Sequence, residues 1–286
     1  MIYLGSDRNL NPTHPLNQGV VADIPIALGY SLADSIRDTS AFSNNVLIVG
    51  ASSTVSLGMS PENFLSLNLG NDTSAAAYIP GNSLLSLSGD FTMSALIHMT
   101  ARNASARNIL RKDTGGGGAA GYWLWRVETN NKISYSNASG TVSANTALSL
   151  NVTYHVCVTR SGSTVTHYLN GLVDGTPGTN AGAPTGTQNI RIGRLDSYSE
   201  QFVGFISNIR LYSGRGLLAD EIWQLYVKTI TKSYDLYKTY TPKLRLLNRL
   251  KPVYVAPPPP STGRVKLVGP GLVGGNPLIT CGGLVK

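Results

Sequence analysis

Acidic side chains are the first groups in this chain that could carry out chemistry, because paired carboxylates about 5–5.5 Å apart cleave glycosidic bonds. Asp196 and Glu200 lie four residues apart in a loop rich in Ser and Tyr, where solvated charges are the expected role. Asp220 and Glu221 are adjacent, but they open a predicted helix. The glutamates without an acidic neighbour at strand spacing are Glu62, Glu128, Glu200 and Glu221. The sequence therefore predicts no glycoside hydrolysis and no enzyme.

Two histidines could bind a metal ion together if they faced the same side of a hairpin. His155 and His167 flank the turn dipeptide Ser161-Gly162. With a two-residue turn there, His155 lies opposite Tyr168 and His167 lies opposite Val156. Residues that lie directly opposite each other share a face, so the two imidazoles point to opposite faces of the hairpin. We expect no metal site between them.

Aromatic residues could stack on a sugar ring or fill a core. Trp123 and Trp125 alternate along one run and share a face, and Tyr122 precedes them. Aromatic side chains dominate β cores, so a core position is the favoured interpretation of this run. The alternative to a core position is that Trp123 stacks on a sugar. The candidate glycan-binding residues are therefore Trp123 and, in a later loop, Tyr198.

Other catalytic and phosphate-binding motifs have little support. The glycine run Gly115–Gly118 is followed by no Lys-Ser/Thr pair and opens no predicted helix, unlike a phosphate-binding loop. A Ser-His-Asp triad stays open, because its members need not be close in sequence, but the chain has no G-x-S-x-G motif.

The elements that must position these residues are mainly strands. Segment Thr153–Gly175 contains two runs rich in β-branched residues, with turns at Ser161-Gly162 and Asn170-Gly171, and it predicts a meander. Cys157 falls within it as a buried free thiol. Leu217–Tyr226 has helical spacing of apolar residues and predicts one helix. The other predicted strands are Phe91–Met99, Arg107–Lys112, Tyr122–Val127, Lys132–Tyr135, Asn189–Gly193 and Phe202–Tyr212, the last interrupted near Ser207.

Composition agrees with an all-β protein and separates two regions by charge. Charged residues make up 13% of the chain, against roughly 25% in an average domain, and there are 31 glycines. Residues 1–226 hold 13 Lys and Arg against 14 Asp and Glu, whereas residues 227–286 hold 10 against one. Residues 227–286 therefore carry all of the positive excess that gives the chain its net charge of +8. The opening MIYLGSDRNL lacks the features of a secretory signal, and no apolar run is long enough for a membrane helix.

Several segments together resemble a known family. GFISNIRLYSGRGLLADEIWQLY is similar to the closing strand and short helix of concanavalin A-like jelly rolls of the laminin-G type. FTMSALIHM, ILRKD and YHVCVTRSGSTVTHYLNGLVDG match earlier landmarks of that family in the expected order. The resemblance covers roughly Val46–Tyr226 and implies an all-β jelly-roll sandwich with one short helix. The segment NPTHPLNQG also resembles the start of such proteins in phage genomes.

The resemblance also implies possible ligands. Domains of the laminin-G type often hold a calcium ion through a loop aspartate, and Asp113, Asp174 and Asp196 are the candidates here, although a loop Asp is more often a turn former. No other cofactor is expected. The fold hosts lectins, adhesion modules, hydrolases and viral structural domains, so it does not by itself define a function.

The sequence therefore predicts an N-terminal arm with the first strands (1–45), a jelly roll (46–226) and a basic, extended C-terminal arm (227–286). The leading hypothesis is a non-enzymatic virion structural or decoration protein, assembled in the host cytoplasm, whose C-terminal arm anchors it to capsid or tail subunits. The alternative is a lectin-like module for surface polysaccharide. We expect a homo-oligomer, no membrane contact and no nucleic acid, since the basic residues are spread among Leu, Val and Tyr. The candidate anchoring residues are Lys243, Arg245, Arg249, Lys251, Arg264 and Lys266.

Overall fold

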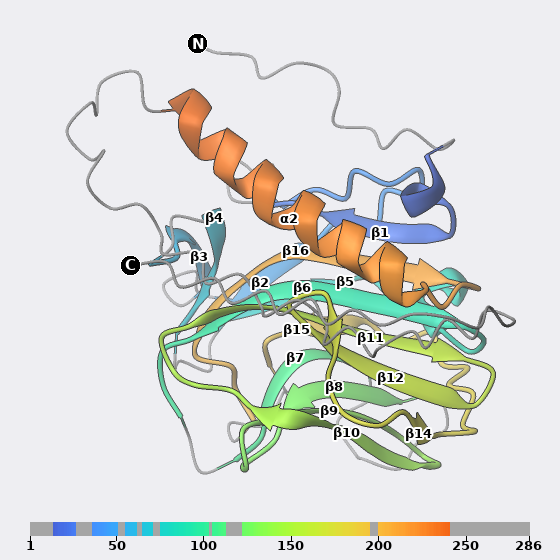
Figure 1. Cartoon of the computed structure of the whole chain (residues 1–286). Coiled ribbons are helices and arrows are strands. Elements are labelled where there is room, and N and C mark those ends of the chain that lie inside the picture. The colour runs from blue at the N-terminus through green and yellow to red at the C-terminus, as the bar shows by residue number, and fades with distance from the viewer. Residues whose placement is uncertain are drawn as a thin grey trace, which may run out of the picture. The chain divides into compact units, whose positions relative to one another are not determined.

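The computed structural model (Figure 1) describes residues 14–26, 36–50, 55–61, 65–70, 75–102, 105–112, 122–194 and 200–240. The chain divides into two compact units, Met1–Pro242 and Lys243–Lys286. All described residues belong to the first unit. The predicted domain boundary between residues 226 and 227 falls inside a helix of that unit.

Two antiparallel sheets form the sandwich of this unit. Among the described residues, nine strands make the first sheet, in the order β13-β12-β11-β6-β16-β4-β3, with β1 beside β16 and β14 beside β12. Its strands are β1 (Val20–Ile24), β3 (Val55–Met59), β4 (Leu65–Leu69), β6 (Phe91–Met99), β11 (Thr153–Ser161), β12 (Thr164–Leu169), β13 (Leu172–Val173), β14 (Gly178–Thr179) and β16 (Gly204–Ser213).

Seven described strands make the second sheet, in the order β10-β9-β8-β7-β15-β5-β2. Its strands are β2 (Leu47–Gly50), β5 (Ala75–Ile79), β7 (Arg107–Lys112), β8 (Trp123–Val127), β9 (Lys132–Asn137), β10 (Gly140–Ala147) and β15 (Ile190–Ile192). Two short 3-10 helices, η1 (Pro15–Asn17) and η2 (Ser83–Ser86), lie outside the sheets. The predicted all-β jelly-roll sandwich is confirmed.

Alternation along the strands builds the core between the sheets. In β6, Phe91, Met93, Ala95 and Ile97 belong to one large cluster of buried apolar residues. The second sheet contributes the indoles of Trp123 and Trp125 from β8 to the same cluster. Side chains of successive residues point to opposite sides of a strand, so the period of two in the sequence becomes the inner face of each sheet.

A smaller core lies on the other side of the first sheet, beneath helix α2 (Ala219–Tyr240). Ile222 and Leu225 of α2 pack there with Cys157 of β11 and Tyr168 of β12. The first turn carries Asp220 and Glu221, as predicted, and the Glu221 carboxylate accepts a hydrogen bond from the backbone N–H of Leu218. Such a contact satisfies one of the free N–H groups at a helix start.

Helix α2 is longer than the short helix predicted over Leu217–Tyr226. It runs to Tyr240. The buried spacing that identified the helix ends near Tyr226, but residues 227–240 contain neither Gly nor Pro, and the first helix-breaking residue is Pro242. None of the helices in the described part of the chain is long and apolar enough to cross a membrane.

Three local features refine the sequence predictions. Ser161 pairs with Thr164, so the β11–β12 turn is Gly162-Ser163 and the register differs by two residues from the predicted one. An even shift preserves the faces, and His155 and His167 do lie on opposite faces. The interruption predicted near Ser207 is a break in the register between β16 and β6. Strand β10 was not predicted.

Candidate functional site

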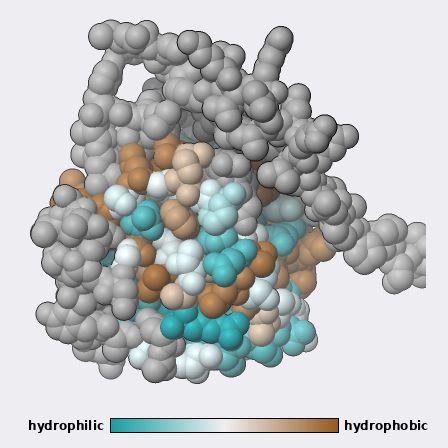
Figure 2. Space-filling view, turned by 90° about the vertical axis from the view of Figure 1, so that its left-hand side faces the viewer, coloured by the Kyte–Doolittle hydropathy of each residue, from teal (hydrophilic) through white to brown (hydrophobic). Residues whose placement is uncertain are grey.

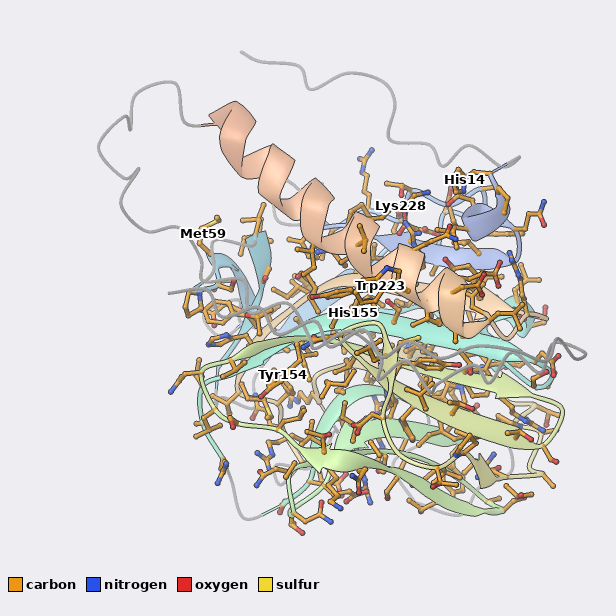
Figure 3. The ribbon with its side chains drawn as sticks, viewed as in Figure 1. His14, Met59, Tyr154, His155, Trp223 and Lys228 are labelled. Atoms are coloured by element: carbon orange, nitrogen blue, oxygen red, sulfur yellow. The ribbon has the colours of Figure 1, made fainter. Side chains whose placement is uncertain are left out.

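The two sheets differ in what covers their outer faces. Helix α2 lies across the first sheet on the side away from the second sheet (Figure 1). Trp223 of α2 lies directly above His155 of β11 (Figure 3), and the Tyr226 ring is centred 5.6 Å from the His155 ring. Among the described residues, no helix packs against the outer face of the second sheet. That face is therefore the candidate site.

Figure 2 shows the left-hand side of the view in Figure 1. Hydrophilic and hydrophobic residues are interleaved over this side, and a run of hydrophilic residues follows its lower edge. The lower edge is the side on which β7, β8, β9 and β10 lie in Figure 1.

Cross-strand pairing places arginines together on the outer face of the second sheet. Arg111 of β7 lies opposite Leu124 of β8 on one side and Arg191 of β15 on the other. Arg126 stands two residues after Leu124 and so points to the same side of β8. We call this surface, with its three arginines Arg111, Arg126 and Arg191, the arginine face.

Small hydroxyl residues continue the arginine face across β9 and β10. Ser136 pairs with Leu124, and Ser134 pairs with Arg126. On the next strand, Thr141 lies opposite Ser136, and their hydroxyl oxygens are 2.8 Å apart. Hydroxyl groups both donate and accept hydrogen bonds, whereas guanidinium groups only donate.

Two carboxylates join the arginines. The Glu200 carboxylate accepts from Arg111 Nη1 at 2.5 Å and from Arg126 Nη1 at 3.3 Å, and Asn108 Nδ2 donates to it at 3.3 Å. The Glu128 carboxylate accepts from Arg126 Nε at 2.8 Å and from the Ser134 hydroxyl at 2.5 Å. Among the described residues, Glu128 and Glu200 thus link Arg111 and Arg126 into one network of ion pairs.

Glu128 and Glu200 are brought to one face by this structure, and each forms an ion pair with Arg126. Such charge-assisted hydrogen bonds fix the geometry of the carboxylate and the guanidinium group. Sequence spacing missed this pair because 72 residues separate the two glutamates. The local signal was Arg126 and Glu128 at strand spacing in one run.

The residues predicted for glycan binding are placed only in part. Trp123 is 0% exposed and lies in the core with Trp125. This is the core position that the sequence favoured for the run. A buried indole offers no ring face to a sugar, so the stacking role proposed for Trp123 does not fit this structure. Tyr198 lies outside the described residues.

The candidate calcium ligands are not brought together in the part of the chain that can be described. The carboxylate of Asp174 accepts hydrogen bonds from the backbone N–H of Thr146, at 3.0 Å, and from its hydroxyl, at 2.7 Å. Asp113 and Asp196 lie outside the described residues. Within those residues, no group of three or more His, Cys, Asp or Glu side chains could hold a metal ion.

The catalytic triad that the sequence left open is represented by a Ser–His pair beneath α2. Ser94 Oγ lies 3.0 Å from His155 Nε2, and the Nδ1 atom of His155 has no hydrogen-bond partner among the described residues. Burial, and then the nearby Arg210 charge, lower the pKa of His155 to about 3. A triad needs a group that orients the imidazole, and the described residues place no such group at His155 Nδ1.

The anchoring residues predicted in the C-terminal segment, Lys243, Arg245, Arg249, Lys251, Arg264 and Lys266, all lie outside the described residues. Their role stays a prediction.

Comparison with known proteins defines the family. The family model described as the concanavalin A-like lectin/glucanases superfamily matches residues 40–223. The chain therefore belongs to this superfamily. No curated protein sequence matches the chain.

Solved structures share the fold at low sequence identity. The binding domain of Paraclostridial Mosquitocidal Protein 1 matches with a TM-score of 0.59 and 16% identity over 75% of this chain and 53% of that one. The binding domain of Botulinum neurotoxin DC, in complex with rat synaptotagmin II, matches with a TM-score of 0.55 and 13% identity over 74% of this chain and 52% of that one. The sialidase of Trypanosoma rangeli matches with a TM-score of 0.52 and 19% identity over 74% and 33%.

The chain thus spans about half the length of the two toxin binding domains and a third of the sialidase. At these identities the likeness shows the fold alone. Two of these three structures are binding domains.

Proposed function

We propose that the jelly roll is a non-enzymatic glycan-binding module and that its ligand lies on the arginine face. The observation that carries the proposal is the pairing of an outer sheet face free of any described helix with a row of arginine and hydroxyl side chains. The same fold occurs in a structure of botulinum neurotoxin type C. Cell entry of that toxin depends on interaction with two ganglioside molecules. That likeness concerns the fold, so the proposal rests on the arginine face.

The chemistry of the face matches the chemistry of a sugar. Each sugar hydroxyl needs donors and acceptors, which Ser136, Thr141 and the arginines supply in alternating positions. Only part of the face is exposed: Thr141 is exposed and Arg126 and Arg191 are half-buried, whereas Arg111, Ser134 and Ser136 are buried. We therefore expect weak binding of single sugars and stronger binding of polysaccharides that make several contacts at once.

The hydroxyl row allows a clean test. The Ser136 and Thr141 hydroxyls bond to each other, and removing both partners with side chains of similar shape is nearly neutral for stability. The double variant Ser136→Ala, Thr141→Val, in the full chain, should lose most of the signal on an array of neutral and acidic glycans. Thr164→Val, at an exposed position of β12 in the first sheet, is the matched control.

We expect the Thr164→Val control to bind as the wild type does. An array on which the wild-type chain binds no glycan, or on which the double variant binds as strongly as the wild type, would contradict the proposed site.

We also propose that the C-terminal segment anchors the protein in a larger assembly, such as a virion. The support is the charge of residues 227–286, which hold 10 basic residues against Asp235 alone, together with their apolar clusters between Gly and Pro. Such clusters can add short strands to a partner sheet, while the basic side chains meet acidic protein surface.

Removal of residues 252–286 tests the anchoring role, because this deletion leaves all described residues in place. We expect the shortened chain to fold, by circular dichroism, but to be missing from particles purified by sedimentation. Normal incorporation of the shortened chain, or binding of the C-terminal segment to DNA with a steep salt dependence, would contradict it.

A further inference from the structure

The Glu200 carboxylate occupies a position built to hold a carboxylate on the arginine face. Two guanidinium groups from adjacent strands, Arg111 of β7 and Arg126 of β8, converge on its two oxygens, at 2.5 and 3.3 Å. The amide of Asn108 adds a third donor at 3.3 Å. Arginine presents several N–H donors in a planar fork that matches the geometry of a carboxylate.

This carboxylate comes from a residue outside the sheet, whose backbone is held separately from its side chain. Glu200 precedes β16, and its backbone carbonyl accepts hydrogen bonds from the backbone N–H of Asn108 at 3.3 Å and from Asn108 Nδ2 at 2.9 Å. The backbone is therefore held independently of the carboxylate. Rotation about the side-chain bonds of Glu200 would open the position between the arginines without moving the chain.

The position can be reached from solvent. The side chains of Arg126 and Glu200 are 21% and 23% exposed, whereas that of Arg111 is 6% exposed and forms the floor. A charge-assisted pair that is partly desolvated is stronger than one in bulk water. A ligand carboxylate that replaces that of Glu200 would keep the same ionic contacts.

The charges around the position favour an anionic ligand. Arg111 lies directly opposite Arg191 on the neighbouring strand β15, and like charges directly opposite each other on a sheet are unfavourable. A ligand carboxylate between Arg111 and Arg126 would supply the negative charge that the Glu200 carboxylate supplies in this structure.

From this geometry we infer that the arginine face selects acidic glycans, with a sugar carboxylate taking the position of the Glu200 carboxylate between Arg111 and Arg126. Glu200 acts as an internal competitor that occupies the site in the absence of ligand. This inference rests on the proposed glycan-binding function and names its ligand class.

Isothermal titration calorimetry of the full chain at low salt tests the inference with two matched probes. One is a hexamer of galacturonic acid, and the other is the same hexamer after reduction of its carboxyl groups. We expect the acidic hexamer to bind at least about tenfold more tightly, because a hydrogen bond to a charged group contributes more than a neutral one. The variants are Arg126→Gln, Glu200→Gln and, as control, Arg37→Gln.

Arg126→Gln should weaken binding of the acidic hexamer by about tenfold and leave the reduced hexamer within about twofold. Glu200→Gln should tighten binding of the acidic hexamer several-fold, because it removes the competing charge. Arg37 is exposed, next to the Asp38 loop that contacts β1 of the first sheet, and Arg37→Gln makes the same change in net charge. Equal thermal midpoints would show that all variants fold alike.

Three results would overturn the inference and leave the proposed function standing: equal binding of the two hexamers, equal losses for Arg126→Gln and Arg37→Gln, or weaker binding of both hexamers by Glu200→Gln. Absence of binding by either hexamer, together with a blank glycan array, would remove the proposed function as well.

Discussion

Lys112 allows a direct test of how the core of the sandwich is built, because its ammonium group is enclosed between the sheets. The residue is 0% exposed, and its Nζ donates a hydrogen bond to the carbonyl oxygen of Leu85 at 2.7 Å. Its neighbours on adjacent strands, Trp123 and Ile190, are apolar. Burial lowers the pKa of Lys112 from 10.5 to about 8.

The sign of the resulting pH dependence follows from proton binding. Between about pH 8 and pH 10.5 the folded state releases the Lys112 proton while the unfolded state keeps it, so this residue makes the free energy of unfolding rise with pH. Below about pH 8 the full cost of burying the charge is present. The lowered pKa corresponds to about 3 kcal/mol.

Urea unfolding of the wild type and of Lys112→Met, followed by tryptophan fluorescence from pH 7 to 10.5, measures this contribution. Taking the difference between the two proteins removes the titration of other groups, such as Tyr135, whose pKa burial raises to about 12. The variant loses the hydrogen bond to Leu85 at every pH, so the change of the difference with pH is the informative quantity. We expect the wild type to gain about 3 kcal/mol relative to the variant across this range. A constant difference would refute a charged, buried Lys112.

Three further predictions concern single side chains. Asp38→Ala should lower the free energy of unfolding by about 3 kcal/mol, because the buried carboxylate accepts four hydrogen bonds; a loss below about 0.5 kcal/mol in urea unfolding would contradict this. Gly171→Ala should cost more stability than Gly162→Ala, since both have positive φ but only the first would place its Cβ against a side chain, 2.8 Å from the Trp223 ring; equal thermal midpoints would argue against close packing of α2. Burial raises the pKa of the Cys157 thiol, so the thiol should react with an aromatic disulfide reagent at pH 8 only after unfolding; rapid reaction of the folded protein would show that the core beneath α2 opens.

The strands were predictable wherever the evidence for them is local. Phe91–Met99 and Arg107–Lys112 appear with the predicted bounds, because alternation and β-branched content act within a few residues. The prediction failed for Gly140–Ala147, where only Val142 and Ala144 face inward between small polar residues. That strand exists because β9 supplies its hydrogen bonds, and pairing is not visible in one strand alone.

The helix shows where local rules end. The sequence identified its start from Asp220, Glu221 and the apolar spacing that follows. Its end was placed too early, because the apolar spacing in the sequence was followed only to Tyr226, whereas the helical backbone continues to Tyr240. The turn between β11 and β12 also lies one residue later than predicted, which changes the register of the two strands by two residues. A register depends on the whole set of contacts across the sheet rather than on one dipeptide.

The amino-acid sequence by itself determined the class of fold, the buried role of Trp125 and Cys157, and the concentration of basic residues in 227–286. These properties follow from composition and from periods of two or about four residues, which need no knowledge of neighbours. The arginine face was decided only by the tertiary structure. The order β8-β7-β15 sets three arginines from three strands side by side, and the approach to β16 brings Glu200 to Arg126 from 74 residues away. Sequence spacing does not encode such a meeting, because it depends on which strands become neighbours when the sheet closes.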